Sequence, residues 1–215
     1  MKALVAEFGK QSSISCEIIV GSSGKLSAQI KEGAPYDIFV AADMKYPQNL
    51  FDSGHVTKAP KPYAYGRLVL WTAKDDIKPS IAILNADRVQ HIALANPKTA
   101  PYGRASMEIM RNYKILDEIE DKFVYGESVS QTNQFILSQS AEIGFTALSV
   151  VMSPSLKNKG SWTAISDSSY TLIEQGASII NRKNESKEGA VTFYRFLYSP
   201  EAKTILKQYG YSVDE

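Results

Sequence analysis

The sequence of 215 residues contains one cysteine, two histidines and no long apolar run. Cys16 alone cannot form an internal disulfide, and with His55 and His91 it would build an ordinary zinc site only if all three converged. No apolar run approaches the roughly 18 residues that a membrane-spanning helix requires. These scarcities argue against a disulfide framework, a zinc centre and a chain that crosses a bilayer.

Charge of either sign is also not in excess. Lys and Arg number 24 and Asp and Glu number 23, which leaves a formal net charge of +1. Without a broad electrostatic field, neither nucleic acid nor an anionic membrane is favoured as a partner, and any anion must be bound locally. The hydrophobic content of 44% is sufficient for one large core or two small ones.

Short apolar segments rich in β-branched residues alternate with segments of helical period, which is the pattern of an α/β protein. Strands are expected at residues 16–21, 37–42, 67–73, 91–96, 122–126, 142–148, 162–166 and 176–181. Helices are expected at residues 2–10, 23–32, 44–53, 102–112, 129–139, 187–198 and 200–208. Pro60 and Pro62 forbid a helix in "KAPKPYAYG" (58–66), so this stretch and "YTLIEQGA" (170–177) are predicted to be crossings between two lobes.

The stretch "GSSGKL" (21–26) resembles a phosphate-binding loop but does not match the sequence pattern of one. A Walker loop requires an earlier glycine and a Ser or Thr directly after the lysine, and both are missing here. What remains is a serine-glycine turn that opens a helix, where unpaired amides and the helix dipole favour an anion. We expect Ser22 or Ser23 to cap the helix with a hydroxyl able to donate to a ligand, while Gly24 lets the backbone come close. An ordinary N-cap without a ligand is the alternative.

Two further turns have the same chemistry. In "NPKTAPYGRAS" (96–106), Tyr102 would present an amide and a phenol at the next helix start, or would simply pack behind a proline-led helix. In "YGESVSQTNQF" (125–135), Ser128 is the expected cap and the amide of Val129 the first exposed donor. Three such turns at strand ends, two in one expected lobe and one in the other, describe a cleft that could surround a small oxyanion with neutral donors.

Catalysis has little support in the sequence. Ser23, Ser149 and His91 could act as nucleophiles or bases by type, but no G-x-S-x-G elbow is present. His91 opens an expected strand and is interpreted as a structural group. The adjacent Asp75 and Asp76 lie in a polar turn and are expected to be solvated. We therefore expect neither an enzyme nor a bound cofactor.

The chain resembles the molybdate-binding proteins that supply ABC transporters, which are class II periplasmic solute-binding proteins. The resemblance rests on "GSSGKLSAQIKEGAPYDIFVAAD" (21–43), "ANPKTAPYGRAS" (95–106), "GESVSQTNQFILSQSAEIGFTALS" (126–149) and "FLYSPEAKTILKQYGY" (196–211). It implies two α/β lobes joined by crossing strands that close on molybdate or tungstate in the cleft between them. Lobe 1 would comprise residues 1–66 and 178–215, and lobe 2 residues 67–177.

The resemblance also implies the ligand contacts. Ser23 matches the serine whose hydroxyl and amide bind the anion, Tyr102 matches a position that binds through its amide or phenol, and Val129 matches an amide donor at a helix start. These contacts are to the molybdate or tungstate oxyanion and not to a protein-bound metal. A monomer, a permease and ATPase complex as partner, and a periplasmic or cell-surface location are implied as well.

Two departures from the family pattern lead to further expectations. Ala147 stands where many members have a ligand tyrosine, so Tyr102 is expected to take the place of that tyrosine. The chain begins at what resembles the family's first helix, so we expect the export signal, the first strand and the first ligand loop to be missing. The alternatives are then a truncated or degenerate member with weak or no binding, or a regulatory oxyanion sensor. The preference among molybdate, tungstate and sulfate stays open.

Overall fold

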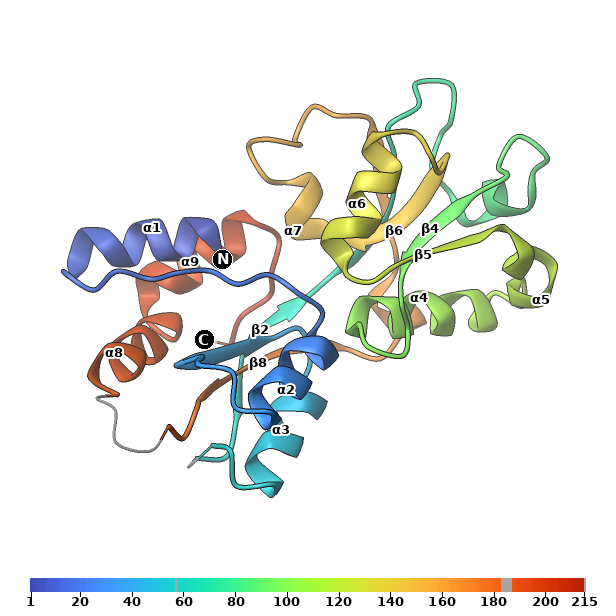
Figure 1. The fold of residues 1–215 in the computed structure, drawn as a ribbon. Helices are drawn as coiled ribbons and strands as arrows, with labels where there is room; N and C mark the ends of the chain where they lie inside the picture. Colours follow the sequence, from blue (N-terminus) through green and yellow to red (C-terminus); the bar gives the residue numbers. More distant parts are fainter. Residues whose placement is uncertain (57, 183–186, 215) are drawn as a thin grey trace. The chain divides into compact units, whose positions relative to one another are not determined.

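The computed structural model describes residues 1–56, 58–182 and 187–214. The chain divides into two compact units, of which unit 1 comprises Met1–Tyr65 and Glu174–Glu215 and unit 2 comprises Gly66–Ile173. The sequence placed these boundaries after residues 66 and 177. Each unit contains a β-sheet with helices on both faces (Figure 1).

Unit 1 is built on a sheet of order β1-β8-β2. Its strands are β1 (Ile38–Ala41), β2 (Lys61–Gly66) and β8 (Ile173–Ile179), and β1 runs antiparallel to β8. Its helices are α1 (Lys2–Gln11), α2 (Ser23–Lys31), α3 (Lys45–Asp52), α8 (Glu188–Leu197) and α9 (Pro200–Gln208).

Alternation along β1 separates two cores in unit 1. Phe39 and Ala41 point to one face and pack with Ile30 of α2 and Leu50 of α3. The intervening residues of β1 contribute to the opposite core, which contains Phe8 of α1 and aromatic residues of α8. Figure 1 shows α2 and α3 on one side of this sheet and α1, α8 and α9 on the other. The two-residue period of the strand thereby fixes the positions of α2 and its first turn.

Unit 2 contains a five-stranded sheet of order β5-β4-β6-β3-β7. The strands are β3 (Leu68–Thr72), β4 (Ile92–Ala95), β5 (Phe123–Gly126), β6 (Ile143–Ala147) and β7 (Ser161–Ala164). β4 runs parallel to β5 and β6, whereas β3 runs antiparallel to β6 and β7. The helices are α4 (Pro101–Asn112), α5 (Leu116–Ile119), α6 (Val129–Leu137) and α7 (Leu148–Val151), with 3-10 turns at Ile81–Asn85, Glu120–Lys122 and Asp167–Ser169.

The central strands of unit 2 are apolar throughout because both of their faces are covered. Every residue of β3, β4 and β6 is buried. Helices α4 and α6 lie on opposite faces of this sheet (Figure 1). The strand–turn–helix order therefore leaves the starts of α4 and α6 at the carboxyl ends of parallel strands.

The predicted helices are all present, and the strands predicted between residues 37 and 181 are present with shifted ends. The strand predicted at 16–21 is wrong. This segment is extended but belongs to no sheet, and Ile19 and Val20 are 48% and 66% exposed. A β-branched sequence favours the extended conformation, but a strand also requires a neighbour to pair with, and none of the described strands pairs with it.

The chain passes between the two units within β2 and β8, in the two stretches that the sequence predicted as crossings, and β2 is a strand although it contains a proline. β2 includes Pro62, which has no amide to donate to a neighbouring strand. The position of β2 at the edge of the unit 1 sheet removes this objection, because an edge strand can face one side without donating. The proline correctly excluded a helix but did not exclude a strand.

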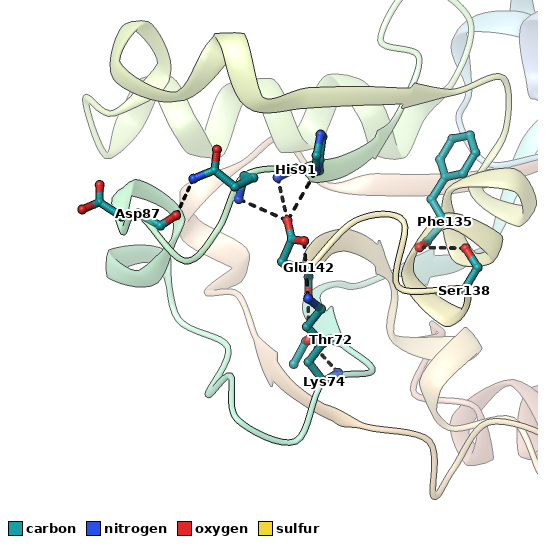
Figure 2. Close-up of polar contacts among 8 residues, drawn as sticks. Thr72, Lys74, Asp87, His91, Phe135, Ser138 and Glu142 are labelled. Atoms are coloured by element: carbon teal, nitrogen blue, oxygen red, sulfur yellow. Dashed lines mark hydrogen bonds and ion pairs between the residues drawn. The ribbon is translucent and has the colours of Figure 1, made fainter.

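A half-buried carboxylate holds the start of β4 (Figure 2). Glu142 accepts hydrogen bonds from the backbone amides of Gln90, at 3.1 Å, and His91, at 2.7 Å, and Lys74 Nζ lies 3.4 Å away. Burial raises the pKa of Glu142, but these amide hydrogen bonds and the Lys74 charge outweigh it, so the pKa lies below its ordinary value. His91 is thus part of a structural contact, as its position in the sequence indicated.

Candidate functional site

Ser23 is the first residue of α2 and is held by the neighbouring strand segment. It is 6% exposed, and its Oγ accepts a hydrogen bond from the backbone amide of Ala42 at 3.1 Å. A hydroxyl has one hydrogen and two lone pairs, so accepting from Ala42 leaves the hydrogen available for donation. The hydroxyl of Ser23 is therefore a buried, oriented donor.

Ser22 is the N-cap residue of α2, one of the two serines that the sequence predicted for this role, but it forms no side-chain cap bond. Neither hydroxyl accepts from an amide of α2, and Ser22 contributes only its carbonyl, which accepts from the Leu26 amide at 3.0 Å. Within the described residues, the amides of Ser23 and Gly24 have no hydrogen-bond partner. Because Ser23 is bonded to Ala42 instead, the first turn of α2 keeps its unpaired amides beside a free hydroxyl hydrogen.

In unit 2, the fold brings the starts of α4 and α6 to one edge of the sheet. β4 and β5 are parallel with Ala95 paired to Gly126, and the Asn96 amide donates to the Gly126 carbonyl at 2.8 Å. α4 follows β4 and α6 follows β5, so Tyr102 and Val129 both lie at the carboxyl edge. These two residues therefore belong to turns that follow neighbouring strands of unit 2.

The start of α6 has the cap that the sequence predicted. Ser128 Oγ accepts from the Gln131 amide at 3.4 Å, and Gln131 Oε1 accepts from the Glu127 amide at 2.7 Å. This reciprocal pairing resembles a capping box. It leaves the amides of Val129 and Ser130 without partners in the described part of the chain. These two amides are the donors that α6 can offer to an anion.

The start of α4 depends on a glycine. A Cβ on Gly103 would overlap the carbonyl of Ala95 at the end of β4, so only glycine allows the helix to approach the strand this closely. Tyr102, the preceding residue, is 4% exposed, and its carbonyl accepts from Ser106 Oγ at 2.8 Å. The backbone of α4 is thus fixed against the sheet at the position of Tyr102.

Sequence reasoning did not identify a polar pair at the same edge. Thr146 of β6 is fully buried, and its Oγ1 donates to Oδ1 of Asn133 in α6 at 2.5 Å. The available signals were a threonine within the apolar strand "GFTA" and an asparagine one helical turn after Val129. Neither is informative without knowledge that the two elements pack together.

The arrangement suits anion binding through neutral donors and does not suit nucleophilic catalysis. The donors are one hydroxyl and backbone amides, which act without a charged side chain. A serine–histidine contact does exist at Ser53 Oγ and His55 Nδ1, 3.0 Å apart. It lies in an exposed turn and uses Nδ1, the nitrogen that a catalytic triad reserves for its acid.

The residues described contain neither a cluster of metal-binding side chains nor a membrane-spanning helix. No group of three or more His, Cys, Asp or Glu side chains there could hold a metal ion. None of the helices described has the length and apolar character needed to cross a membrane.

A known protein family matches nearly the whole chain. Its profile, described as bacterial extracellular solute-binding protein, matches residues 1–212. The molybdate-binding protein ModA of Azotobacter vinelandii is 34% identical over 215 residues, which cover 99% of this chain and 85% of that protein. A putative ABC transporter substrate-binding lipoprotein of Bacillus subtilis, YvgL, is 28% identical over 198 residues, which cover 90% of this chain and 74% of that protein.

Solved structures share the fold. The periplasmic molybdate-binding protein of Azotobacter vinelandii superimposes with a TM-score of 0.92 at 33% identity, covering 100% of this chain and 94% of that chain. A periplasmic thiamin-binding protein, at 16% identity and a TM-score of 0.70, shows that proteins of this fold bind different ligands. The periplasmic-binding-protein fold expected from the sequence is confirmed.

Proposed function

Because the chain belongs to the family of bacterial extracellular solute-binding proteins, we propose that it binds a tetrahedral oxyanion, molybdate or tungstate, and delivers it to an ABC transporter. The observation that carries the proposal is the start of α2. There the Ser23 hydroxyl is fixed by the Ala42 amide, and the amides of Ser23 and Gly24 are unpaired within the described residues. An oxyanion is the simplest ligand that accepts from all of these donors at once.

Unit 2 supplies the second group of donors in this proposal. The amides of Val129 and Ser130, and the α4 start at Tyr102, lie at one sheet edge. We propose that Tyr102 and Val129, like Ser23, are oxyanion-binding residues. Neutral donors can stabilise a dianion because the hydrogen bonds to it are charge-assisted and therefore stronger than neutral ones.

The ligand class is supported by the relatives and by the donor chemistry together. The Azotobacter vinelandii relative is named for molybdate. The groups described offer hydrogens to a ligand, which suits an anion that only accepts hydrogen bonds. Sulfate would satisfy the same donors, so the size of the bound anion decides between sulfate and the larger molybdate and tungstate. The role proposed is capture and delivery, with no catalytic residue and no cofactor.

The partner and the location follow from the same family. We propose that the loaded protein, as a monomer, presents the anion to the permease and ATPase of an ABC transporter outside the cytoplasm, in the periplasm or at the cell surface. Uptake of molybdate into vesicles that contain such a transporter should depend on added protein. Uptake that is unchanged by the protein would contradict delivery while leaving binding intact.

Binding is tested by thermal unfolding with molybdate, tungstate, sulfate and phosphate, followed by calorimetry. A ligand at 100 times its Kd should stabilise the protein by about 2.7 kcal/mol. Molybdate and tungstate should raise the Tm, and Ser23→Ala should abolish most of that rise. Ser27→Ala is the matched control, because Ser27 is also buried in α2, one turn further on. If none of the four anions shifts the Tm, the proposed function is wrong.

A further inference from the structure

Asn133 occupies a position on α6 from which its side chain reaches the start of the helix. It lies four residues after Val129, so the two residues share one face of α6. Side chains of a helix incline toward its N-terminus, which brings the Asn133 carboxamide over the first turn. That turn contains the unpaired amides of Val129 and Ser130.

The sheet register places Thr146, the partner of Asn133, at the same edge. β4 and β6 are parallel with Ala93 paired to Gly144, and continuing this register brings Thr146 beside Ala95. Ala95 is paired to Gly126 on its other side and packs against Gly103 of α4. The Asn133–Thr146 pair therefore lies at the level where α4 and α6 begin.

The hydrogen bond from Thr146 determines which way the carboxamide faces. Thr146 Oγ1 is a donor in this bond, so it selects Oδ1, the only acceptor of the Asn133 side chain. The amide group is planar, and Nδ2 with its two hydrogens is consequently turned away from Thr146. Among the residues that the structure describes, the bond from Thr146 is the only hydrogen bond of the Asn133 side chain, so Nδ2 has no partner there. Asn133 is only partly buried, so Nδ2 can reach a ligand.

We propose that Asn133 donates a side-chain hydrogen bond from Nδ2 to the bound oxyanion and that Thr146 is the positioning residue that keeps Nδ2 toward it. This inference rests on the proposed function. An asparagine adds a donor without adding charge, in keeping with the hydroxyl and amides that make up the other donors. If the carboxamide flipped, it would present Oδ1 to the anion, and Thr146 prevents that flip.

The first test compares molybdate affinities by calorimetry for the wild type, Asn133→Asp and Asn133→Leu. Asp keeps the size of the side chain and the acceptor for Thr146, but it turns a carboxylate oxygen toward the anion. We expect an affinity loss of roughly 100-fold for Asn133→Asp and roughly tenfold for Asn133→Leu, in line with the energy of hydrogen bonds to charged groups. Gln134→Glu is the control, because it adds the same charge at the next, exposed position of α6.

The second test isolates the positioning role of Thr146 by a double-mutant cycle. Thr146→Val should weaken molybdate binding roughly three- to tenfold in the wild type and have no further effect in Asn133→Leu. Thermal unfolding without ligand shows whether each variant is folded, and a purely structural role would lower the unliganded Tm without this dependence on Asn133. Equal losses from Thr146→Val in both backgrounds would overturn the positioning role.

The outcomes separate this inference from the proposed function. If the wild type binds molybdate and Ser23→Ala does not, while Asn133→Asp and Asn133→Leu bind like the wild type, the role of Asn133 is wrong and the function stands. An affinity loss in Gln134→Glu as large as in Asn133→Asp would also overturn it, since charge alone would then explain the effect. If the wild type binds none of the four oxyanions, both proposals fail.

Discussion

The two units offer donors of different kinds. Unit 1 relies on a side chain, because the Ser23 hydroxyl is bonded to the Ala42 amide and keeps its hydrogen for a ligand. Unit 2 relies on backbone amides at the starts of α4 and α6, which are held by Gly103 and by the Ser128 cap. The same residue type, serine, is a donor in one unit and a structural cap in the other.

This difference determines how each part of the proposed site can be damaged. A side-chain donor can be removed by one small substitution that leaves the backbone unchanged. A backbone donor is lost only when the local fold is altered. Substitution of Ser23 in unit 1 should therefore separate binding from stability, whereas substitutions that disturb the backbone at the starts of α4 and α6 in unit 2 should change the two together.

The largest effect is expected for Gly103→Ala in unit 2. The added Cβ would overlap the Ala95 carbonyl, so α4 must move away from β4. We expect a loss of about 3 kcal/mol or more in the free energy of unfolding, together with loss of molybdate binding. Denaturant titration and calorimetry measure the two.

Gly9→Ala is the control for that substitution. Gly9 lies in α1 with no atom within 4 Å of an added Cβ. Alanine should stabilise this helix by roughly 0.5–1 kcal/mol, because glycine is the poorer helix former. A Gly103→Ala protein as stable as the wild type would show that the approach of α4 to β4 is not limited by this glycine.

The next effect, Ser23→Ala in unit 1, should concern affinity alone. Removing the hydroxyl deletes a hydrogen bond to a charged ligand, which is worth about 1.5–3 kcal/mol, or roughly 10- to 150-fold in Kd. The unliganded free energy of unfolding should fall by less, since Ala42 loses only one neutral hydrogen bond. An unliganded stability loss equal to the loss in binding energy would place Ser23 among the structural serines.

Glu142→Gln should reduce stability without reducing affinity. The pKa of Glu142 is lower in the folded protein than its ordinary value, so its ionised form contributes stability that is fully present above pH of about 5 and is lost as pH falls through the folded pKa. We expect the wild type to lose stability over that interval and Glu142→Gln to lose less. Denaturant titrations at pH intervals of roughly one unit, between about pH 6 and 3, measure how the free energy of unfolding changes with pH. Parallel slopes for the two proteins would show that another carboxylate dominates.

The smallest effect is expected for Ser128→Ala at the start of α6. Loss of an N-cap typically costs about 1 kcal/mol of stability. Val129 and Ser130 keep their amides in this variant. Molybdate affinity should therefore fall only slightly, because the first turn of α6 is less well ordered without its cap. A large affinity loss with unchanged stability would mean that Ser128 itself binds the ligand, and the contrast between the two units would no longer hold.

Local patterns in the sequence were sufficient to locate the helices and the turns that carry the donors. Ser128 was predicted as a cap because its neighbours favour a helix start, and the structure confirms it. The absence of a strand at 16–21 was not predictable in the same way, because pairing depends on a neighbour distant in sequence. The bond that fixes the Ser23 hydroxyl was not predictable for a related reason, since Ala42 lies 19 residues away from Ser23.

The sequence by itself determined that the starts of α2, α4 and α6 would expose neutral donors, because caps, prolines and glycines act within a few residues of the chain. Only the tertiary structure decided what those donors are fixed to: Ser23 to Ala42, Gly103 to Ala95 and Asn133 to Thr146. Each of these contacts joins a helix to a strand or to the residue directly after one. Their geometry depends on sheet register and close packing, which no short stretch of sequence contains.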